Sequence, residues 1–193
     1  MSFHYRVARS SPYTLTHIVT IPIAWRRIPK LLHTISTQEF NVAQAQILTN
    51  QITLHLQEYN MIISGSKQSR LLTDLRDALM APADILSETS IHIPSPCKFS
   101  LYNVPSFPYS TMEIECPDRA GLLQDLLSFL GTMPYELHSA FSSANHDKDA
   151  HHTFHYTFHM QMNNTPLSPQ DMDYMQNVFA YHTKCSTLQM PLL

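Results

Sequence analysis

The sequence predicts an α+β fold made of two consecutive β-α-β-β-α-β units. Three observations support this fold class. Segments in which apolar and polar residues alternate, as in half-buried strands, recur along the chain. Between them lie segments whose apolar residues recur at i, i+3, i+4 and i+7, as on one face of a helix. The same order of elements then repeats after roughly 90 to 95 residues, which indicates an internal duplication.

The first half contains three predicted strands and two predicted helices. The strands are expected at 15–23, 40–48 and 51–63, and the helices at 26–37 and 66–80. The first helix has one apolar face, and a proline in its first turn, where a missing N–H costs no hydrogen bond; these residues are Ile28, Leu31, Leu32, Ile35 and Pro29. Ser66 is expected to cap the second helix.

A proline-containing connector follows, at 81–96, and then a strand at 99–104, which is expected to return and complete the first unit. The second half repeats the order. Its strands are predicted at 111–116, 137–143, 151–162 and 188–192, and its helices at 119–130 and 168–181. The expected cap of the first of these helices is Asp118. Ser168 caps the second, with Pro169 in the first helical position.

The predicted domains are therefore a first domain at 1–82, a connector with the returning strand at 83–108, and a second domain at 109–193. This order of elements is the split β-α-β arrangement of ferredoxin-like domains, in which two helices cover one face of an antiparallel sheet. The other face of each sheet is then free to meet another sheet or a ligand.

Composition excludes several classes of function. Charged residues make up 14% of the chain, the net charge is -3 and no basic run occurs, so we expect no nucleic-acid partner. Three glycines are too few for a P-loop or a dinucleotide fingerprint. The apolar stretches are far shorter than the about 20 residues of a membrane span, and the first ten residues lack an apolar signal core. We therefore expect a cytoplasmic protein with no membrane partner and no cofactor.

No catalytic or metal motif stands out. Cys97, Cys116 and Cys185 are far apart in the sequence and form no C-x-x-C pair, so we expect isolated reduced thiols. A nucleotidyltransferase requires a Gly-Ser followed by paired aspartates on a strand. Here Gly65-Ser66 is followed by a leucine-rich helix instead. The dipeptide His146-Asp147 lies in a polar hairpin without helical support. We expect no catalytic residue in this chain.

The most informative segment is 111–130, which reads TMEIECPDRAGLLQDLLSFL. An alternating strand that enters D-R-x-G-L-L and then an apolar helix resembles the ACT family. The segments LHSAF at 137–141 and FNVAQAQI at 40–47 resemble the second ACT strand, each with a small residue, Ala140 and Ala45. The order of two such units around a connector is similar to the C-terminal regulatory region of the bifunctional uridylyltransferase/uridylyl-removing enzymes, which modify the PII nitrogen-signalling protein.

This resemblance implies a regulatory module that senses an amino acid such as glutamine, without the catalytic domains. The implied ligand-binding residues are Asp118, Arg119, Ala120, Gly121 and Leu122. A helix N-terminus suits a carboxylate, and a glycine lets a ligand approach the backbone. Asp118 either pairs with the ligand's ammonium group or only caps the helix. Arg119 either reaches a carboxylate or crosses the domain interface.

The first half lacks this turn, because the corresponding segment reads AWRRIP at 24–29. Trp25 is expected to fill the space of a ligand, so the first site is predicted to be weak or lost. The second half also departs from the family after its second strand, where the segment 145–149 reads NHDKD. Glutamine specificity is therefore open.

The histidines of the predicted strand 151–162 form a further candidate site. His151, His155 and His159 share one face of the strand, but residues i and i+4 lie roughly 13 Å apart, too far for one zinc ion. We expect Glu113 and Glu115 on the neighbouring strand, so the face is either a hydrogen-bonded polar surface, a metal site or a pH-responsive interface.

Two main hypotheses remain. One is a regulatory amino-acid-binding module. The other is an ACT-type module that binds no ligand and mediates oligomerisation or protein interaction. An enzyme with a metal site at the histidines ranks third. In either of the first two cases the expected partner is a second copy of the chain or a separate catalytic chain.

Overall fold

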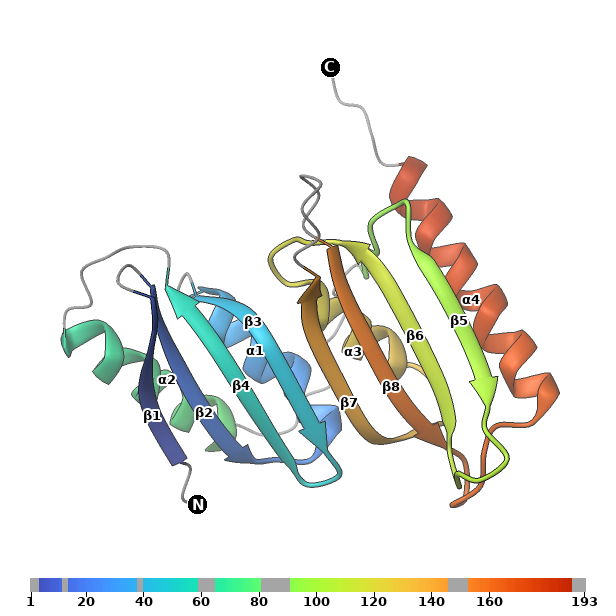
Figure 1. The fold of residues 1–193 in the computed structure, drawn as a ribbon, viewed down its shortest axis with the longest axis horizontal. Helices are drawn as coiled ribbons and strands as arrows, with labels where there is room; N and C mark the ends of the chain where they lie inside the picture. Colours follow the sequence, from blue (N-terminus) through green and yellow to red (C-terminus); the bar gives the residue numbers. More distant parts are fainter. Residues whose placement is uncertain are drawn as a thin grey trace.

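The computed structural model describes residues 4–11, 14–37, 40–58, 65–80, 91–145 and 153–188. Their strands form one antiparallel sheet of eight strands in the order β1-β2-β4-β3-β7-β8-β6-β5 (Figure 1). The strands are β1 (His4–Ser11), β2 (Thr14–Pro22), β3 (Phe40–Leu48), β4 (Gln51–Glu58), β5 (Lys98–Asn103), β6 (Ser110–Pro117), β7 (Glu136–Asn145) and β8 (Thr153–Gln161). The α-helices are α1 (Ile28–Thr37), α2 (Gly65–Met80), α3 (Leu122–Gly131) and α4 (Pro169–Leu188), and a 3-10 helix, η1 (Trp25–Arg27), precedes α1.

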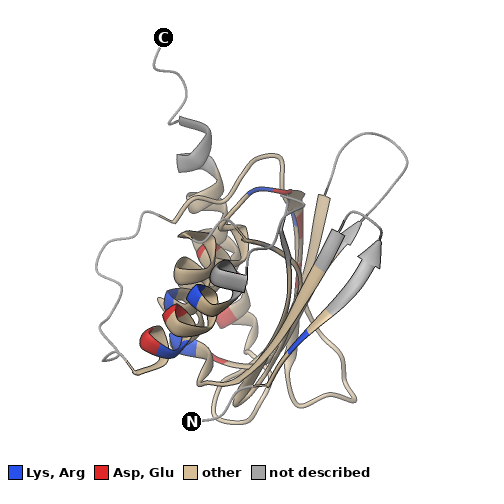
Figure 2. Ribbon diagram, turned by 90° about the vertical axis from the view of Figure 1, so that its left-hand side faces the viewer, with Lys and Arg blue, Asp and Glu red and all other residues tan. Residues whose placement is uncertain are grey.

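The molecule has two layers, because all four α-helices cover the same face of the sheet (Figures 1 and 2). The core lies between the layers. Strand β8 shows the reason most clearly: its residues alternate between buried and half-buried, so one side meets the helices. The large buried side chains Phe129 of α3 and Phe158 of β8 come from the two layers. No described helix covers the opposite side of the sheet, called the open face below.

The two halves of the sheet have matching strand orders, 1-2-4-3 and 5-6-8-7, and meet where β3 pairs with β7. In this pairing Ala45 lies opposite Ser142, and the Ala45 backbone N–H donates to Ser142 Oγ at 2.8 Å. Helices α1 and α3 also contact each other across the boundary. The halves therefore share one sheet and one core.

The strand expected to complete the first half was placed in the wrong unit. A strand does form at Lys98–Asn103, but it pairs with β6 of the second half, with Lys98 opposite Glu115. The matching position in the first half is occupied by β1, a strand the pattern did not predict. Each half therefore runs β-β-α-β-β-α. The physical reason is the short connection between β5 and β6, since strands joined by a short link usually pair with each other.

Other boundaries differ by small amounts. Strand β3 has the predicted bounds, whereas α2 begins at Gly65, one residue before its predicted cap. Helix α4 reaches Leu188, the first residue of the predicted final strand; 189–193 lie outside the described residues. Its cap is as predicted: the Asp171 N–H donates to Ser168 Oγ at 3.2 Å, and the Ser168 hydroxyl donates to the Asp171 carboxylate at 2.5 Å.

Candidate functional site

The turn between β6 and α3 is shaped by Gly121. This residue has φ +78°, in the left-handed region, and occupies the N-cap position of α3 without a side-chain capping hydrogen bond. The Asp125 N–H donates to the Gly121 carbonyl at 3.0 Å, which makes the first helical hydrogen bond. The prediction that Asp118 caps this helix is therefore wrong: the chain turns once more before the helix begins, and Asp118 is left exposed on the loop.

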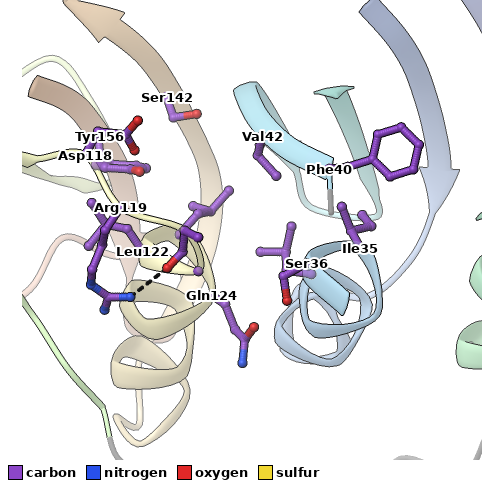
Figure 3. Close-up of a pocket in the computed structure, with 14 residues that line it drawn as sticks. Ile35, Ser36, Phe40, Val42, Asp118, Arg119, Leu122, Gln124, Ser142 and Tyr156 are labelled. Atoms are coloured by element: carbon purple, nitrogen blue, oxygen red, sulfur yellow. Dashed lines mark hydrogen bonds between the residues drawn. The ribbon is translucent and has the colours of Figure 1, made fainter. Parts of the chain in front are cut away.

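Arg119 folds back onto its own half of the molecule. Its guanidinium forms an ion pair with Asp125 and donates to the His92 carbonyl, and its Nη1 donates to the Ala120 carbonyl at 2.9 Å. Its charge is therefore already paired, and the side chain fastens the turn to the segment that precedes β5. In this arrangement Arg119 neither crosses to the first half nor points into the space between the halves (Figure 3).

A cavity of about 230 Å³ lies where the two halves meet (Figure 3). All five residues of the predicted site line it: Asp118, Arg119, Ala120, Gly121 and Leu122. The second half also contributes Leu123, Gln124, Ser142 and Tyr156. The first half contributes the end of α1 and the start of β3, through Leu32, Ile35, Ser36, Phe40 and Val42. That these residues bind a ligand stays a prediction.

The residues from the first half were missed by the sequence analysis. They read as an ordinary apolar helix face and an ordinary strand, and only the pairing of β3 with β7 brings them to the turn at 117–121. Tyr156 lies on the buried side of β8, at 3% exposed, and nothing in its spacing indicated a cavity. The alternation of Tyr156 with His155 and Thr157 shows which side of the sheet its side chain faces, but not which residues of other elements lie next to it.

The cavity combines polar groups with an apolar wall. Burial raises the pKa of Tyr156, and the nearby Cys116 and Asp118 act in the same direction, so its hydroxyl stays neutral and can donate a hydrogen bond. Gln124 is also buried, at 8% exposed. The Leu122 N–H at the start of α3 already donates to the Arg119 carbonyl at 3.3 Å, whereas the next N–H groups, of Leu123 and Gln124, have no acceptor within the helix, by the geometry of any helix start. The cavity therefore contains the positive end of a helix dipole, a carboxylate and neutral donors.

The corresponding turn of the first half contains a buried tryptophan. Trp25 is buried at 8% exposed, and the Arg26 guanidinium lies 4.6 Å from the centroid of the Trp25 ring. Arg26 also donates to the carbonyls of Gly131 and Tyr135 in the second half, at 3.1 and 3.2 Å. This turn makes contacts between the halves, and the loss of a ligand site there stays a prediction.

The described histidines of β8 lie beside β6 and its glutamates, as predicted. Strand β6 pairs with β8, which sets Glu115 directly opposite His155. Lys98 forms an ion pair with Glu115 at 3.0 Å, so this carboxylate already has a cationic partner. Among the residues that the structure describes, no group of three or more His, Cys, Asp or Glu is placed to hold a metal ion. His151, His152 and the dipeptide His146-Asp147 lie outside the described residues.

Comparisons with known proteins address the fold alone. The sequence matches no protein-family model and no curated protein. The structure is similar to a crystal structure of aspartate kinase from Synechocystis, with a TM-score of 0.54 and 10% sequence identity. The match covers 89% of this chain and 27% of the kinase chain, so this chain spans about a quarter of that protein. Aspartate kinase contains ACT regulatory domains.

The fold is ACT-like. This fold agrees with the resemblance of the D-R-x-G-L-L segment to the ACT family. The structural likeness does not show a relationship to the PII uridylyltransferases. In the described part of the chain, no helix has the length and apolar character needed to cross a membrane.

Proposed function

We propose that this chain is a regulatory module of two tandem ACT domains that binds one small amino acid in the cavity between its halves. It works in the cytoplasm, carries no catalytic group of its own, and controls a catalytic chain or its own assembly. Glutamine is the first ligand to test, because the sequence resembles the regulatory region of the PII uridylyltransferases. The observation that carries the proposal is that all five predicted ligand-binding residues line a cavity completed by the other half.

The chemistry of the cavity suits a zwitterion. A ligand carboxylate can accept hydrogen bonds from the first-turn N–H groups of α3, where the helix dipole favours negative charge. The ligand ammonium group can pair with Asp118. Gln124, Ser142 and Tyr156 offer neutral hydrogen-bonding groups, and Leu32, Ile35 and Val42 offer apolar contact for a side chain. Arg119 acts indirectly, by holding the turn through Asp125.

The size of the cavity favours a small ligand. Its volume of about 230 Å³ lies below the roughly 300–1,000 Å³ of sites for drug-sized molecules. Nucleotides and larger cofactors are therefore poor candidates, and a single amino acid is the natural occupant. Because both halves line the cavity, a bound ligand changes how tightly they are held together, which is a physical route to regulation.

Calorimetric titration with each of the twenty amino acids tests this function. We expect binding heat for one or a few of them. The variant Val42→Phe fills the cavity from the first half, so it should weaken that binding at least tenfold. The matched control is Gln46→Phe, on an exposed position of the same strand, which should leave binding unchanged. An absence of heat across the whole panel, or equal loss in both variants, would contradict the proposal.

A second function, oligomerisation without a ligand, is favoured by the open face. Phe141 is 40% exposed there and Phe107 is 46% exposed, and Phe107 stacks on Tyr109, which in turn stacks on His159 at 4.4 Å. Exposed aromatic groups of this kind often mark protein contacts. Light scattering at pH 5.5 and 7.5 measures the oligomer, and the Phe141→Glu variant should reduce it to a monomer. A wild-type protein that is monomeric at both pH values and at high concentration would rule this function out.

A further inference from the structure

The sheet brings together two cysteines that are far apart in the sequence. Strands β5 and β6 are antiparallel, with Lys98 opposite Glu115, and one further step of the same register places Cys97 opposite Cys116. Directly opposed residues of antiparallel strands have Cα atoms about 4.5–5.5 Å apart, within the range that a disulfide bond requires. The expectation that these thiols are isolated is therefore wrong for this pair.

Both side chains lie on the side of the sheet that faces the helices. Cys116 belongs to the buried core at 1% exposed, and Cys97 is half-buried and packs against that core. The register of the two strands therefore places their thiols next to each other on this side of the sheet. Neither cysteine is bonded to another residue in this structure, so the pair is present in its reduced form.

The two thiols differ in a way that assigns them different roles. The neighbouring Cys116 thiol lowers the pKa of Cys97, although burial and the Glu115 carboxylate act in the opposite direction. The neighbouring Cys97 thiol, together with burial, raises the pKa of Cys116. Cys97 is also the more accessible of the two. A thiolate that solvent can reach, next to a buried thiol, is the arrangement of an attacking and a resolving cysteine.

The two cysteines lie at the ends of two neighbouring segments, the segment before β5 and the turn after β6. Cys97 ends the segment 91–97, whose His92 carbonyl accepts a hydrogen bond from Arg119. Cys116 immediately precedes the turn at 117–121. A covalent bond between them would therefore fasten the segment before β5 to the start of that turn, next to the contact that Arg119 already makes.

We propose that Cys97 and Cys116 form a reversible intramolecular disulfide, which makes this corner of the sheet a thiol-based redox site. With a peroxide as the two-electron oxidant, the Cys97 thiolate attacks the peroxide and becomes a sulfenic acid, while water or an alcohol leaves. The Cys116 sulfur then attacks the Cys97 sulfur, its proton leaves with the hydroxyl group as water, and the S–S bond forms. A dithiol reductant reverses the reaction. This inference does not depend on amino-acid binding.

Peptide mapping of the full chain tests the proposal. The protein is treated with hydrogen peroxide, its remaining thiols are blocked, and it is digested without reduction. We expect a cross-linked peptide pair containing Cys97 and Cys116, a mass loss of two hydrogens, and recovery of both thiols with dithiothreitol. The Cys185→Ser variant should give the same product, since the third cysteine takes no part. The proposal would be overturned if all the disulfides formed were intermolecular, or if the bridge involved Cys185.

Two further variants test the assigned roles. In Cys116→Ser the sulfenic acid on Cys97 has no resolving partner, so a dimedone-type probe should label Cys97 at least several-fold more than in the wild type. In Cys97→Ser we expect little labelling of Cys116. The reverse pattern would contradict the roles. Amide hydrogen exchange of the oxidised wild type should slow within 92–97, and unchanged exchange there would contradict the fastening of this segment.

Discussion

Gly121 determines the shape of the turn that lines the cavity. An added Cβ would meet only Arg119 Nη1, at 3.7 Å, which is an ordinary contact, so space does not require a glycine. The backbone does, because φ +78° is a conformation that residues with a side chain rarely adopt. The glycine is therefore required by the backbone conformation of the turn, and any role in letting a ligand approach comes in addition.

The substitution Gly121→Ala should lower the free energy of unfolding by about 1–2 kcal/mol through this backbone strain. The matched control is Gly131→Ala, at the end of the same helix, where an added Cβ meets nothing within 4 Å. Since alanine favours a helix over glycine, that variant should be neutral or more stable by up to about 1 kcal/mol. Urea unfolding measures both, and a Gly121→Ala protein as stable as the wild type would contradict the assignment.

His159 makes the stability depend on pH. Burial lowers its pKa, with nearby His138 acting in the same direction, and burial also lowers the pKa of His55 and His182. The unfolded chain therefore takes up protons at a higher pH than the folded protein. Stability from these groups is present above the ordinary histidine pKa of about 6.5 and is lost as the pH falls through the lower folded values.

We accordingly expect a lower melting temperature at pH 5.5 than at pH 7.5. The variant His159→Gln should reduce this difference without removing it, because His55 and His182 still contribute. His33→Gln, on the exposed side of α1, is the control. Thermal unfolding followed by circular dichroism at several pH values provides the measurement, and a melting temperature that rises on acidification would show that the sign is wrong.

At the scale of single elements, α3 is held at both ends by arginines. Arg119 pairs with Asp125 in its first turn, and Arg26 of the first half binds the carbonyls of Gly131 and Tyr135 at and just beyond its end. A cation at a helix C-terminus meets the negative end of the dipole and satisfies carbonyls that have no partner within the helix. This contact also joins the halves on the helix side of the sheet.

Removing the Arg26 contact should loosen α3 from the first half. Arg26→Ala is expected to cost about 1 kcal/mol of unfolding free energy, since the lost hydrogen bonds are charged but partly exposed. Amide exchange should speed up near residues 131–135. Arg27→Ala is the matched control, because Arg27 donates to the Leu79 carbonyl within the first half, at 2.9 Å. Faster exchange near 131–135 in the control as well would argue against a specific contact.

The elements were largely predictable and their partners were not. Alternation located β3, β6 and β8 closely, and the apolar face of 28–35 located α1. The start of α3 was placed three residues early, because the turn needs Gly121 in a left-handed conformation, which composition alone does not reveal. The assignment of β5 to the wrong half has a similar cause: a strand's pattern shows which side is buried but not which neighbour it pairs with.

At the scale of the whole molecule, the site depends on an arrangement that no local pattern contains. The turn at 117–121 was identified from its sequence, whereas Ile35, Ser36 and Val42 join it only because β3 pairs with β7. The same pairing makes one continuous sheet and one open face, so a ligand in the cavity and a partner on the open face would act on opposite sides of the same layer.

Amino-acid binding between the halves is tested most directly by an NMR titration of the ¹⁵N-labelled protein with each of the twenty amino acids. We predict that at least one of them shifts the amide signals of Ser36 and Val42 in the first half and of Gly121 and Gln124 in the second. Both sets should shift with the same midpoint, because one ligand contacts both halves. If no amino acid shifts these signals, or if the shifts are confined to one half, then the cavity is not the binding site proposed here.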